Sequence, residues 1–302
     1  MSNSTFSGNY LTGALSKMTS ALVPGSDGQK SSVNYALPVG EQLLPLNDLI
    51  GHKLSLEYQG EIFCCHCGRK SKKSFNQGFC YPCFRKLPQC DSCIMSPEKC
   101  HYFEGTCRDA AWGDKFCMTD HVVYLANSSG LKVGITRGTQ VPTRWIDQGA
   151  SQAMPFIRVS TRQQSGLIET IFKEFVNDRT NWRAMLKGPP ETLDLKQHAL
   201  ELLDMNTSRI MALQEQFGIQ AVQPMVGTLI GKDKSYDVST PEVIEIDYPV
   251  TQYPTKITSQ SFDKKPFIEG TLLGIKGQYL ILDSGVINIR KHTAYQVTIS
   301  VD

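Results

Sequence analysis

The chain has 302 residues, enough for two or three domains, and its net charge is only +2. With 40% hydrophobic and 20% charged residues, it has the composition of an ordinary globular protein. Because the net charge is small, overall electrostatics do not indicate nucleic-acid binding. Only local patches of positive charge could support it. We expect no signal peptide and no membrane span, hence a cytoplasmic protein whose cysteines remain thiols.

The N-terminal segment, residues 1–62, is predicted to be rich in β-structure. Three strand-like stretches occur at 10–15, 33–38 and 53–63, and a polar loop with the sequence PGSDGQKSS interrupts them.

All ten cysteines lie between Cys64 and Cys117, and His121 closes the group. Thiolates at short spacings can converge on one ion without a large core behind them. In a reducing compartment such crowding favours zinc over a disulfide framework. We therefore predict a zinc-binding module over residues 63–121.

Two CxxC pairs come first and predict one tetrahedral zinc site, with the ligands Cys64, Cys67, Cys80 and Cys83. Each pair can form a tight knuckle, and the 12 residues between the pairs form a hairpin. The glycine after Cys67 permits the positive φ that such turns often need. Cys65 is a spare thiol that could replace Cys64.

A second zinc site has more candidates than places: Cys90, Cys93, Cys100, Cys107, Cys117 and His121. We expect the CDSC pair, Cys90 and Cys93, to supply two of the ligands. Two of the residues Cys107, Cys117 and His121 would complete the set. Cys100 or His121 could instead merely pack or form hydrogen bonds. The chain is thus expected to hold two structural Zn²⁺ ions.

Basic and aromatic residues are interleaved around the first two knuckles. The basic residues are Arg69, Lys70, Lys72, Lys73, Arg85 and Lys86. With the neighbouring phenylalanines and tyrosine, they could contact a phosphate backbone and stack on bases. Alternatively, this is a solvated basic hairpin whose aromatic side chains cover the small zinc core.

The segment 122–189 predicts a small α/β domain. Two apolar strands, 122–126 and 131–136, flank a turn, and a short helix after Pro142 carries Arg144. A third strand follows at 153–161. Residues 165–178 then show helical spacing of apolar side chains, with Ser165 as the expected N-cap.

This order of elements resembles the GIY-YIG nuclease superfamily over about residues 121–180. The resemblance matches Tyr124 to the tyrosine of the first strand and Lys132-Val133-Gly134 to the YIG strand. It also matches Arg144 to the helix arginine and Glu169 to the metal-binding glutamate. Lys132 stands where the family has its second tyrosine, and the first motif reads VVY.

The chemistry implied by the resemblance is metal-dependent phosphodiester hydrolysis. Glu169 would hold one Mg²⁺ or Mn²⁺, and Arg144 would bind the scissile phosphate. Tyr124 would orient or deprotonate the attacking water, and Lys132 could do so only with a lowered pKa. Each residue also has a structural alternative: Tyr124 as a strand aromatic, Glu169 as an acid near a helix N-terminus, and Arg144 as an exposed cation.

The rest of the chain is predicted as a helical connector at 190–222 and a β-rich segment at 223–302. The expected fold class is α+β, with β-rich segments at both ends flanking the zinc module and the GIY-YIG-like domain. The two β-rich ends could pair into one barrel or sandwich.

The overall arrangement, CxxCG…CxxC, GTCR and VYLANSSGLKVGITR, looks like an uncharacterised family of bacterial zinc-binding proteins. Our first hypothesis is a zinc-stabilised nucleic-acid-processing protein with a nuclease centre. The alternatives are a non-catalytic nucleic-acid-binding protein with a degenerate nuclease fold, or a protein-interaction scaffold with two structural zincs.

Overall fold

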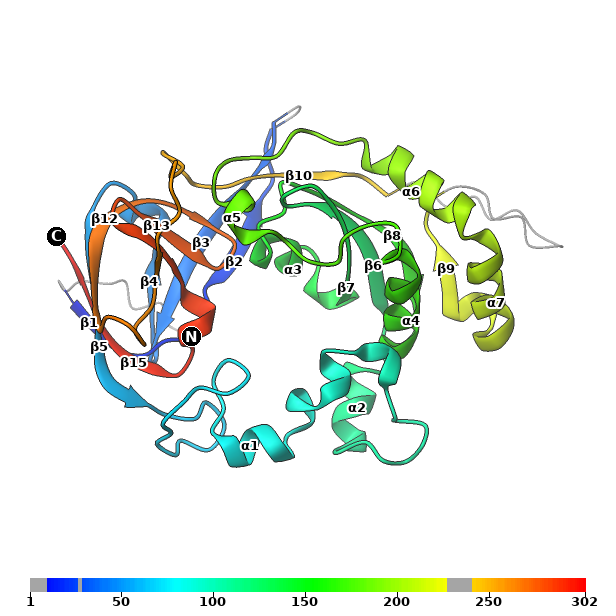
Figure 1. Ribbon diagram of the computed structural model, residues 1–302, viewed down its shortest axis with the longest axis horizontal. Helices are drawn as coiled ribbons and strands as arrows, with labels where there is room; N and C mark the ends of the chain where they lie inside the picture. The colour runs from blue at the N-terminus through cyan, green and yellow to red at the C-terminus, as the bar shows by residue number, and fades with distance from the viewer. Residues whose placement is uncertain (1–9, 27–28, 227–240) are drawn as a thin grey trace.

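The computed structural model of the chain describes residues 10–26, 29–226 and 241–302. The expectation about a signal peptide falls largely on residues 1–9, which lie outside the described ranges. Helices and strands mix along the chain, and the strands form two sheets, which confirms the predicted α+β class with β-rich ends (Figure 1). Within the described ranges, no helix is both long and apolar enough to cross a lipid bilayer.

The first sheet joins the two ends of the chain. Its strand order is β1 (Tyr10–Ala14), β15 (Tyr295–Val301), β5 (Lys53–Ile62), β12 (Phe267–Lys276), β13 (Tyr279–Leu282), β14 (Gly285–Asn288) and β11 (Ser259–Gln260). β5 is antiparallel to both β12 and β15, so N-terminal and C-terminal strands alternate in one sheet. The two β-rich ends therefore do pair.

The second sheet holds the central part of the chain. Its strand order is β2 (Thr19–Val23), β3 (Ser31–Val39), β10 (Ile244–Asp247), β8 (Gln152–Val159), β6 (His121–Asn127) and β7 (Leu131–Arg137). β4 (Gln42–Pro45) pairs with β3, and β9 (Val222–Pro224) pairs with β8. β6 and β7 form the predicted hairpin, with Tyr124 opposite Gly134.

Every residue of β6 is buried, because both faces of this sheet are covered. The helices of this region are α3 (Thr143–Asp147), α4 (Arg162–Phe172), α5 (Trp182–Met185), α6 (Leu195–Met205) and α7 (Thr207–Phe217). Val123 and Leu125 point into a core shared with α4, α6 and α7. Tyr124 and Ala126 point the other way, into the core that holds Trp145 of α3 and the strands of the first sheet.

The start of α4 corrects one sequence prediction. The N-cap is Thr161, whose side chain accepts a hydrogen bond from the backbone of Gln164 in a full capping box. Ser165, the predicted N-cap, is wholly buried inside the helix and donates to the carbonyl of Arg162. The reciprocal Thr161–Gln164 pair satisfies two backbone donors, and this adds a turn before the apolar spacing begins.

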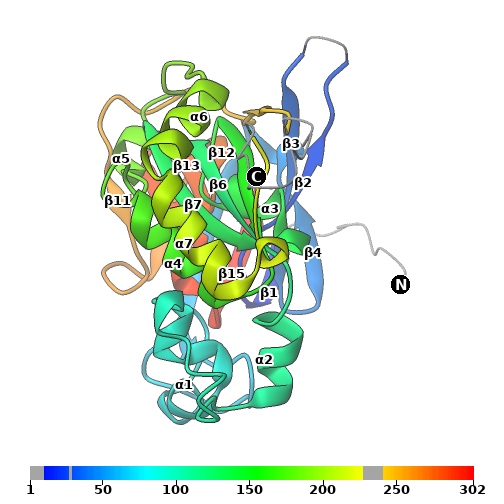
Figure 2. The ribbon, with the colours of Figure 1, turned by 90° about the vertical axis from the view of Figure 1, so that its right-hand side faces the viewer.

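The cysteine-rich segment links the two sheets at one end of the molecule (Figures 1 and 2). It contains only two short α-helices, α1 (Tyr81–Lys86) and α2 (Ala110–Phe116), with 3-10 turns between them. Three hydrophobic clusters form the core of the described structure, and none of them takes a residue from 63–121. This segment therefore lacks an apolar core of its own.

Candidate metal centre and neighbouring polar cluster

The first cysteine group converges as predicted. The sulfur atoms of Cys64, Cys67, Cys80 and Cys83 all lie within 4.8 Å of one another. The Cys67 and Cys80 sulfurs are 3.7 Å apart. Tetrahedral zinc with Zn–S bonds of about 2.3 Å requires sulfurs separated by about 3.8 Å. These four thiols can therefore hold a metal ion such as zinc.

Local backbone structure explains how each pair reaches this geometry. In the first pair, the amide of Gly68 donates to the carbonyl of Cys64 at 2.9 Å, and Gly68 has a φ of +69°. Only glycine adopts that conformation without cost, so the predicted role of this residue is correct. In the second pair, Cys80 is the N-cap of α1 and Cys83 lies in its first turn. Cys64 belongs to the group of four, whereas the exposed Cys65 does not.

The surroundings of Cys64 favour ionised sulfur, whereas burial and the neighbouring sulfurs raise the pKa of Cys83. Burial alone raises the pKa of Cys64, but hydrogen bonds from the backbone of Cys80, Cys67 and His66 outweigh it and lower the pKa to about 6. Since the thiolate is the form that binds metal, this sulfur is ready to act as a ligand at neutral pH.

The six basic residues of the predicted nucleic-acid-binding patch are all exposed around this site: Arg69, Lys70, Lys72, Lys73, Arg85 and Lys86. Lys70 forms an ion pair with Glu61 at 2.8 Å. Phe75 packs against Tyr81 and Phe84, with ring centroids 5.5 and 5.8 Å away. The aromatic side chains therefore pack on one another beside the cysteines, and the cations remain at the surface.

The candidate ligands for a second metal site lie in different parts of the cysteine-rich segment. Cys93, Cys107 and Cys117 line one small cavity together with Cys100. Cys90 is buried elsewhere and lies 3.5 Å from the side-chain nitrogen of Asn76.

His121 is fully buried at the start of β6, where its Nδ1 atom lies 2.7 Å from the carbonyl oxygen of Thr119. Its Nε2 atom has no hydrogen-bond partner within the described parts of the chain. Burial lowers the pKa of His121 to about 4. The neutral ring is thus held by β6 and is absent from the lining of the cysteine cavity.

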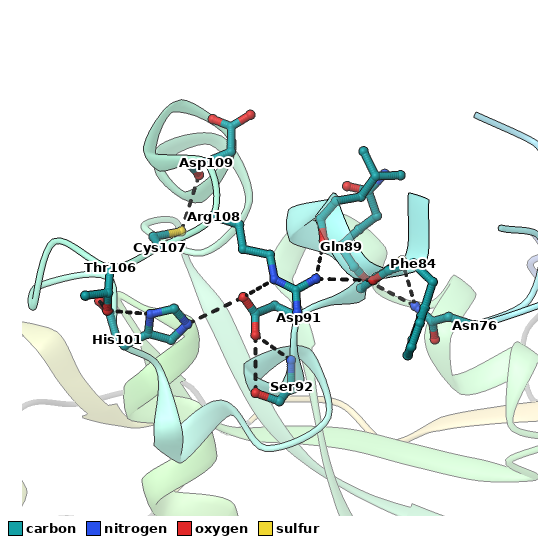
Figure 3. Close-up of polar contacts among 12 residues, drawn as sticks. Asn76, Phe84, Gln89, Asp91, Ser92, His101, Thr106, Cys107, Arg108 and Asp109 are labelled. Atoms are coloured by element: carbon teal, nitrogen blue, oxygen red, sulfur yellow. Dashed lines mark hydrogen bonds and ion pairs between the residues drawn. The ribbon is translucent and has the colours of Figure 1, made fainter. Parts of the chain in front are cut away.

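A buried carboxylate organises this second cysteine region (Figure 3). Asp91 accepts hydrogen bonds from the backbone of Ser92 at 2.6 Å and from Arg108 Nε at 2.8 Å. Arg108 also donates to the carbonyls of Phe84 and Leu87 at the end of α1. This arginine therefore ties the two cysteine groups together.

Two of the predicted catalytic residues, Tyr124 and Lys132, meet at a residue that the sequence did not single out, Gln148. The hydroxyl of Tyr124 and the ammonium of Lys132 both donate to Oε1 of Gln148, each at 2.8 Å. Gln148 follows α3, four residues after Arg144. This i, i+4 spacing on a helical segment is the signal that could have revealed Gln148.

Tyr124, Lys132, Arg144 and Glu169 form a polar cluster in which burial shifts the pKa values of three members. The pKa of Lys132 falls to about 8 through burial and, secondarily, the charge of Arg144. Burial raises the pKa of Tyr124 to about 12, and the charge of Arg144 works against that rise. Burial also raises the pKa of Glu169, opposed by Lys173 and the cluster's own cations. The four residues thus lie close enough for their charges to interact.

Glu169 reaches the cluster from α4, on the other face of the sheet. Its carboxylate is half-buried and makes no side-chain hydrogen bond to Tyr124, Lys132 or Arg144 in the described ranges. Asp178 is a second half-buried carboxylate whose charge acts on both Glu169 and Lys132. Carboxylates in this setting can accept a divalent cation together with water ligands.

Comparison with known proteins places the chain in a family. Residues 51–297 match the family described as "Protein of unknown function (DUF2797)". The chain belongs to this family. The match spans the cysteine region, the polar cluster and the C-terminal strands, and the family's description names no activity.

No curated protein and no solved structure matches the chain. The prediction of an uncharacterised family is therefore confirmed, whereas the comparisons add no support for the GIY-YIG nucleases in particular.

Proposed function

We propose that this protein is a zinc-stabilised phosphodiesterase acting on nucleic acid, with Tyr124, Lys132, Arg144 and Glu169 as its catalytic centre. The main support is the convergence of Tyr124 and Lys132 on Gln148, with Arg144 one helical turn before it. A strand hairpin, a short helix and a later helix supply these residues in the order that the resemblance to GIY-YIG nucleases requires.

The cations of the cluster suit a phosphate group. Arg144 is half-buried and bears a permanent charge, so it can bind the scissile phosphate and stabilise negative charge in the transition state. Lys132 lies close to Arg144, and their mutual repulsion helps to lower the lysine pKa to about 8.

The pKa shifts favour Lys132 over Tyr124 as the general base. With a pKa near 8, Lys132 has a substantial neutral fraction at slightly alkaline pH, and its neutral amine can take a proton from water. Tyr124 has a pKa raised to about 12 and remains protonated, so it orients neighbouring groups through its hydroxyl. Lys132 would thus take over the role of the family's second tyrosine.

Glu169 would hold the divalent cation, with Asp178 as an acidic neighbour whose charge acts on it. When bound, Mg²⁺ or Mn²⁺ would polarise the phosphate and stabilise the leaving oxygen. The raised pKa of Glu169 is a cost of burying a carboxyl group, and a bound cation would offset it.

The test is cleavage of labelled single-stranded, duplex and structured DNA and RNA by the zinc-loaded protein with Mg²⁺ or Mn²⁺. Glu169→Gln should reduce the rate by about 100-fold or more, because it removes the metal ligand at nearly constant shape. The matched control is Glu174→Gln, which alters an exposed glutamate paired with Arg209 at 2.8 Å. The control should cleave like the wild type, and equal loss in both variants would contradict the proposed centre.

A second candidate function has its own support in the exposed cations around the first cysteine site. If neither wild type nor variant cleaves any substrate, the salt dependence of binding decides between the alternatives. Steeply salt-dependent binding that Lys72→Ala and Lys73→Ala weaken would indicate a nucleic-acid-binding protein without catalysis. Absence of both cleavage and binding would favour a protein-interaction scaffold.

A further inference from the structure

A small cavity in the second cysteine region has a lining rich in thiols. Its volume is about 10 Å³, close to the smallest space that holds one water molecule. Four of the residues around it are cysteines: Cys93, Cys100, Cys107 and Cys117. They come from a 3-10 turn at Ser92–Ile94, the end of the next 3-10 turn, the loop before α2 and the end of α2.

The four thiol-bearing side chains gather around this one cavity although they come from different turns and loops. All four are free cysteines, so no disulfide explains why they gather here. Four cysteines around one ion-sized space match the residue set of a structural zinc site.

Two other residues near this cavity could compete as ligands. Side-chain atoms of Asp91 and His101 lie within 4.8 Å of each other and of the Cys93 sulfur. However, Asp91 is already neutralised by Arg108 at 2.8 Å and bonded to the amide of Ser92 (Figure 3).

The imidazole of His101 is also engaged on both sides. Its Nδ1 atom lies 2.7 Å from the hydroxyl of Thr106, and its Nε2 atom lies 3.5 Å from Asp91. Asp91 and His101 therefore form a hydrogen-bonded layer beside the thiols, of the kind that supports ligands from outside.

We infer that Cys93, Cys100, Cys107 and Cys117 form a second zinc site. This assignment replaces Cys90 by Cys100 and leaves out His121. Cys90 lies against Asn76 of the first cysteine group, and His121 does not line the cavity. A structural zinc here does not depend on whether the polar cluster cleaves phosphodiesters.

The second site also holds the first turn of α4, the helix that carries Glu169. The amide of Arg162 donates to the carbonyl of Cys117 at 2.8 Å. Gln163 Nε2 donates to the carbonyl of Cys100 at 3.0 Å, and Arg162 donates to that of Ile94 at 2.6 Å. A metal that fixes Cys100 and Cys117 would therefore fix the start of α4 as well.

The experiment measures zinc per chain in the purified full-length protein and in two single-cysteine variants. The wild type should contain two zinc ions, Cys100→Ser should contain one, and Cys90→Ser should still contain two. One zinc in the wild type, or loss of a zinc from Cys90→Ser with retention in Cys100→Ser, would overturn the assignment.

A second measurement needs only the wild type and so does not depend on how a variant folds. X-ray absorption at the zinc edge should give an all-sulfur shell at about 2.3 Å. A nitrogen or oxygen contribution at about 2.0 to 2.1 Å would indicate His101, His121 or Asp91 as a ligand and reject the four-cysteine site.

Hydrogen exchange then tests the link to α4. In Cys100→Ser, the amides of residues 162–165 should exchange faster, whereas Cys90→Ser should leave them protected. Unchanged protection in a Cys100→Ser protein that has lost one zinc would show that the site does not hold the helix.

Discussion

Lys276 is a fully buried lysine at the end of β12, and its burial links the stability of the fold to pH. Its ammonium lies 5.3 Å from the ring centroid of Tyr248 and 5.4 Å from that of Tyr253, with the carbonyl of Gly188 at 3.4 Å. Burial lowers the pKa of Lys276 to about 8, although the charge of Asp247 opposes the shift. The folded protein therefore releases this proton at lower pH than an unfolded chain does.

We predict that Lys276→Met changes how stability depends on pH. An unfolded lysine keeps its proton up to a pH of about 10.4, so between about pH 8 and that value the unfolded chain binds more protons. The free energy of unfolding of the wild type should accordingly rise with pH relative to the variant across this window. Urea unfolding at several pH values measures the difference, and Lys291→Met serves as an exposed lysine control. Parallel curves for wild type and Lys276→Met would contradict the buried ammonium.

At the same scale, sequence spacing predicts which thiols lie together locally but not which distant thiols join them. Cys64 and Cys67 could be paired from spacing alone, because a CxxC turn brings its own sulfurs together. Cys90 and Cys93 have the same spacing, yet Cys90 lies against Asn76. Cys100 reaches the small cavity instead, and that position depends on tertiary packing that no local pattern encodes.

At the scale of elements, α4 is packed unusually closely against the second cysteine region. A Cβ atom on Gly166 would lie 2.5 Å from the amide nitrogen of Glu98 and 2.7 Å from Pro97 Cβ. Backbone atoms cannot move aside cheaply, so a glycine is needed here although glycine weakens a helix.

We predict that Gly166→Ala lowers the free energy of unfolding by about 1 to 2 kcal/mol, since overpacking outweighs the gain in helix propensity. Gly138→Ala is the control, because its Cβ would meet only Asp120 O at 3.7 Å. The control should change stability by no more than about 0.5 kcal/mol. Denaturant unfolding compares the two variants. A stabilised Gly166→Ala protein would mean that the contact with Pro97 and Glu98 is loose.

The positions of strands and helices along the chain were predicted more reliably than the pairing of the strands in the sheets. The apolar runs at 122–126 and 131–136 become β6 and β7. The helix predicted over 165–178 ends at Phe172, and Phe175, which continued the apolar spacing, lies exposed beyond the end of α4. The pairing of β5 with β12 and β15 joins residues more than two hundred positions apart in the sequence. Only the burial of a shared core, with Leu54, Leu56 and Val297 among its members, selects that arrangement.

At the scale of the whole molecule, stability is divided between two different sources. The sheets are held by hydrophobic clusters that combine strands from both ends of the chain. Residues 63–121 contribute no member to these clusters and lie at one end of the fold (Figure 2). Conformational entropy of about 1 to 2 kcal/mol per ordered residue must be offset there by something other than apolar burial.

Metal binding can supply that free energy. A structural zinc contributes about 10 to 16 kcal/mol in small zinc-binding peptides, which is comparable to the entire stability of a typical domain. We therefore predict that chelating the zinc unfolds residues 64–121 while the sheet built from β5, β12 and β15 stays folded. Hydrogen exchange with and without chelator should show loss of amide protection confined to the cysteine region and the first turn of α4, which is bonded to it. A metal-free protein that kept native protection across 64–121 would remove zinc as the organiser of this region. Simultaneous loss of protection in β5 and β12 would instead show that the cysteine region and the sheets unfold as one unit.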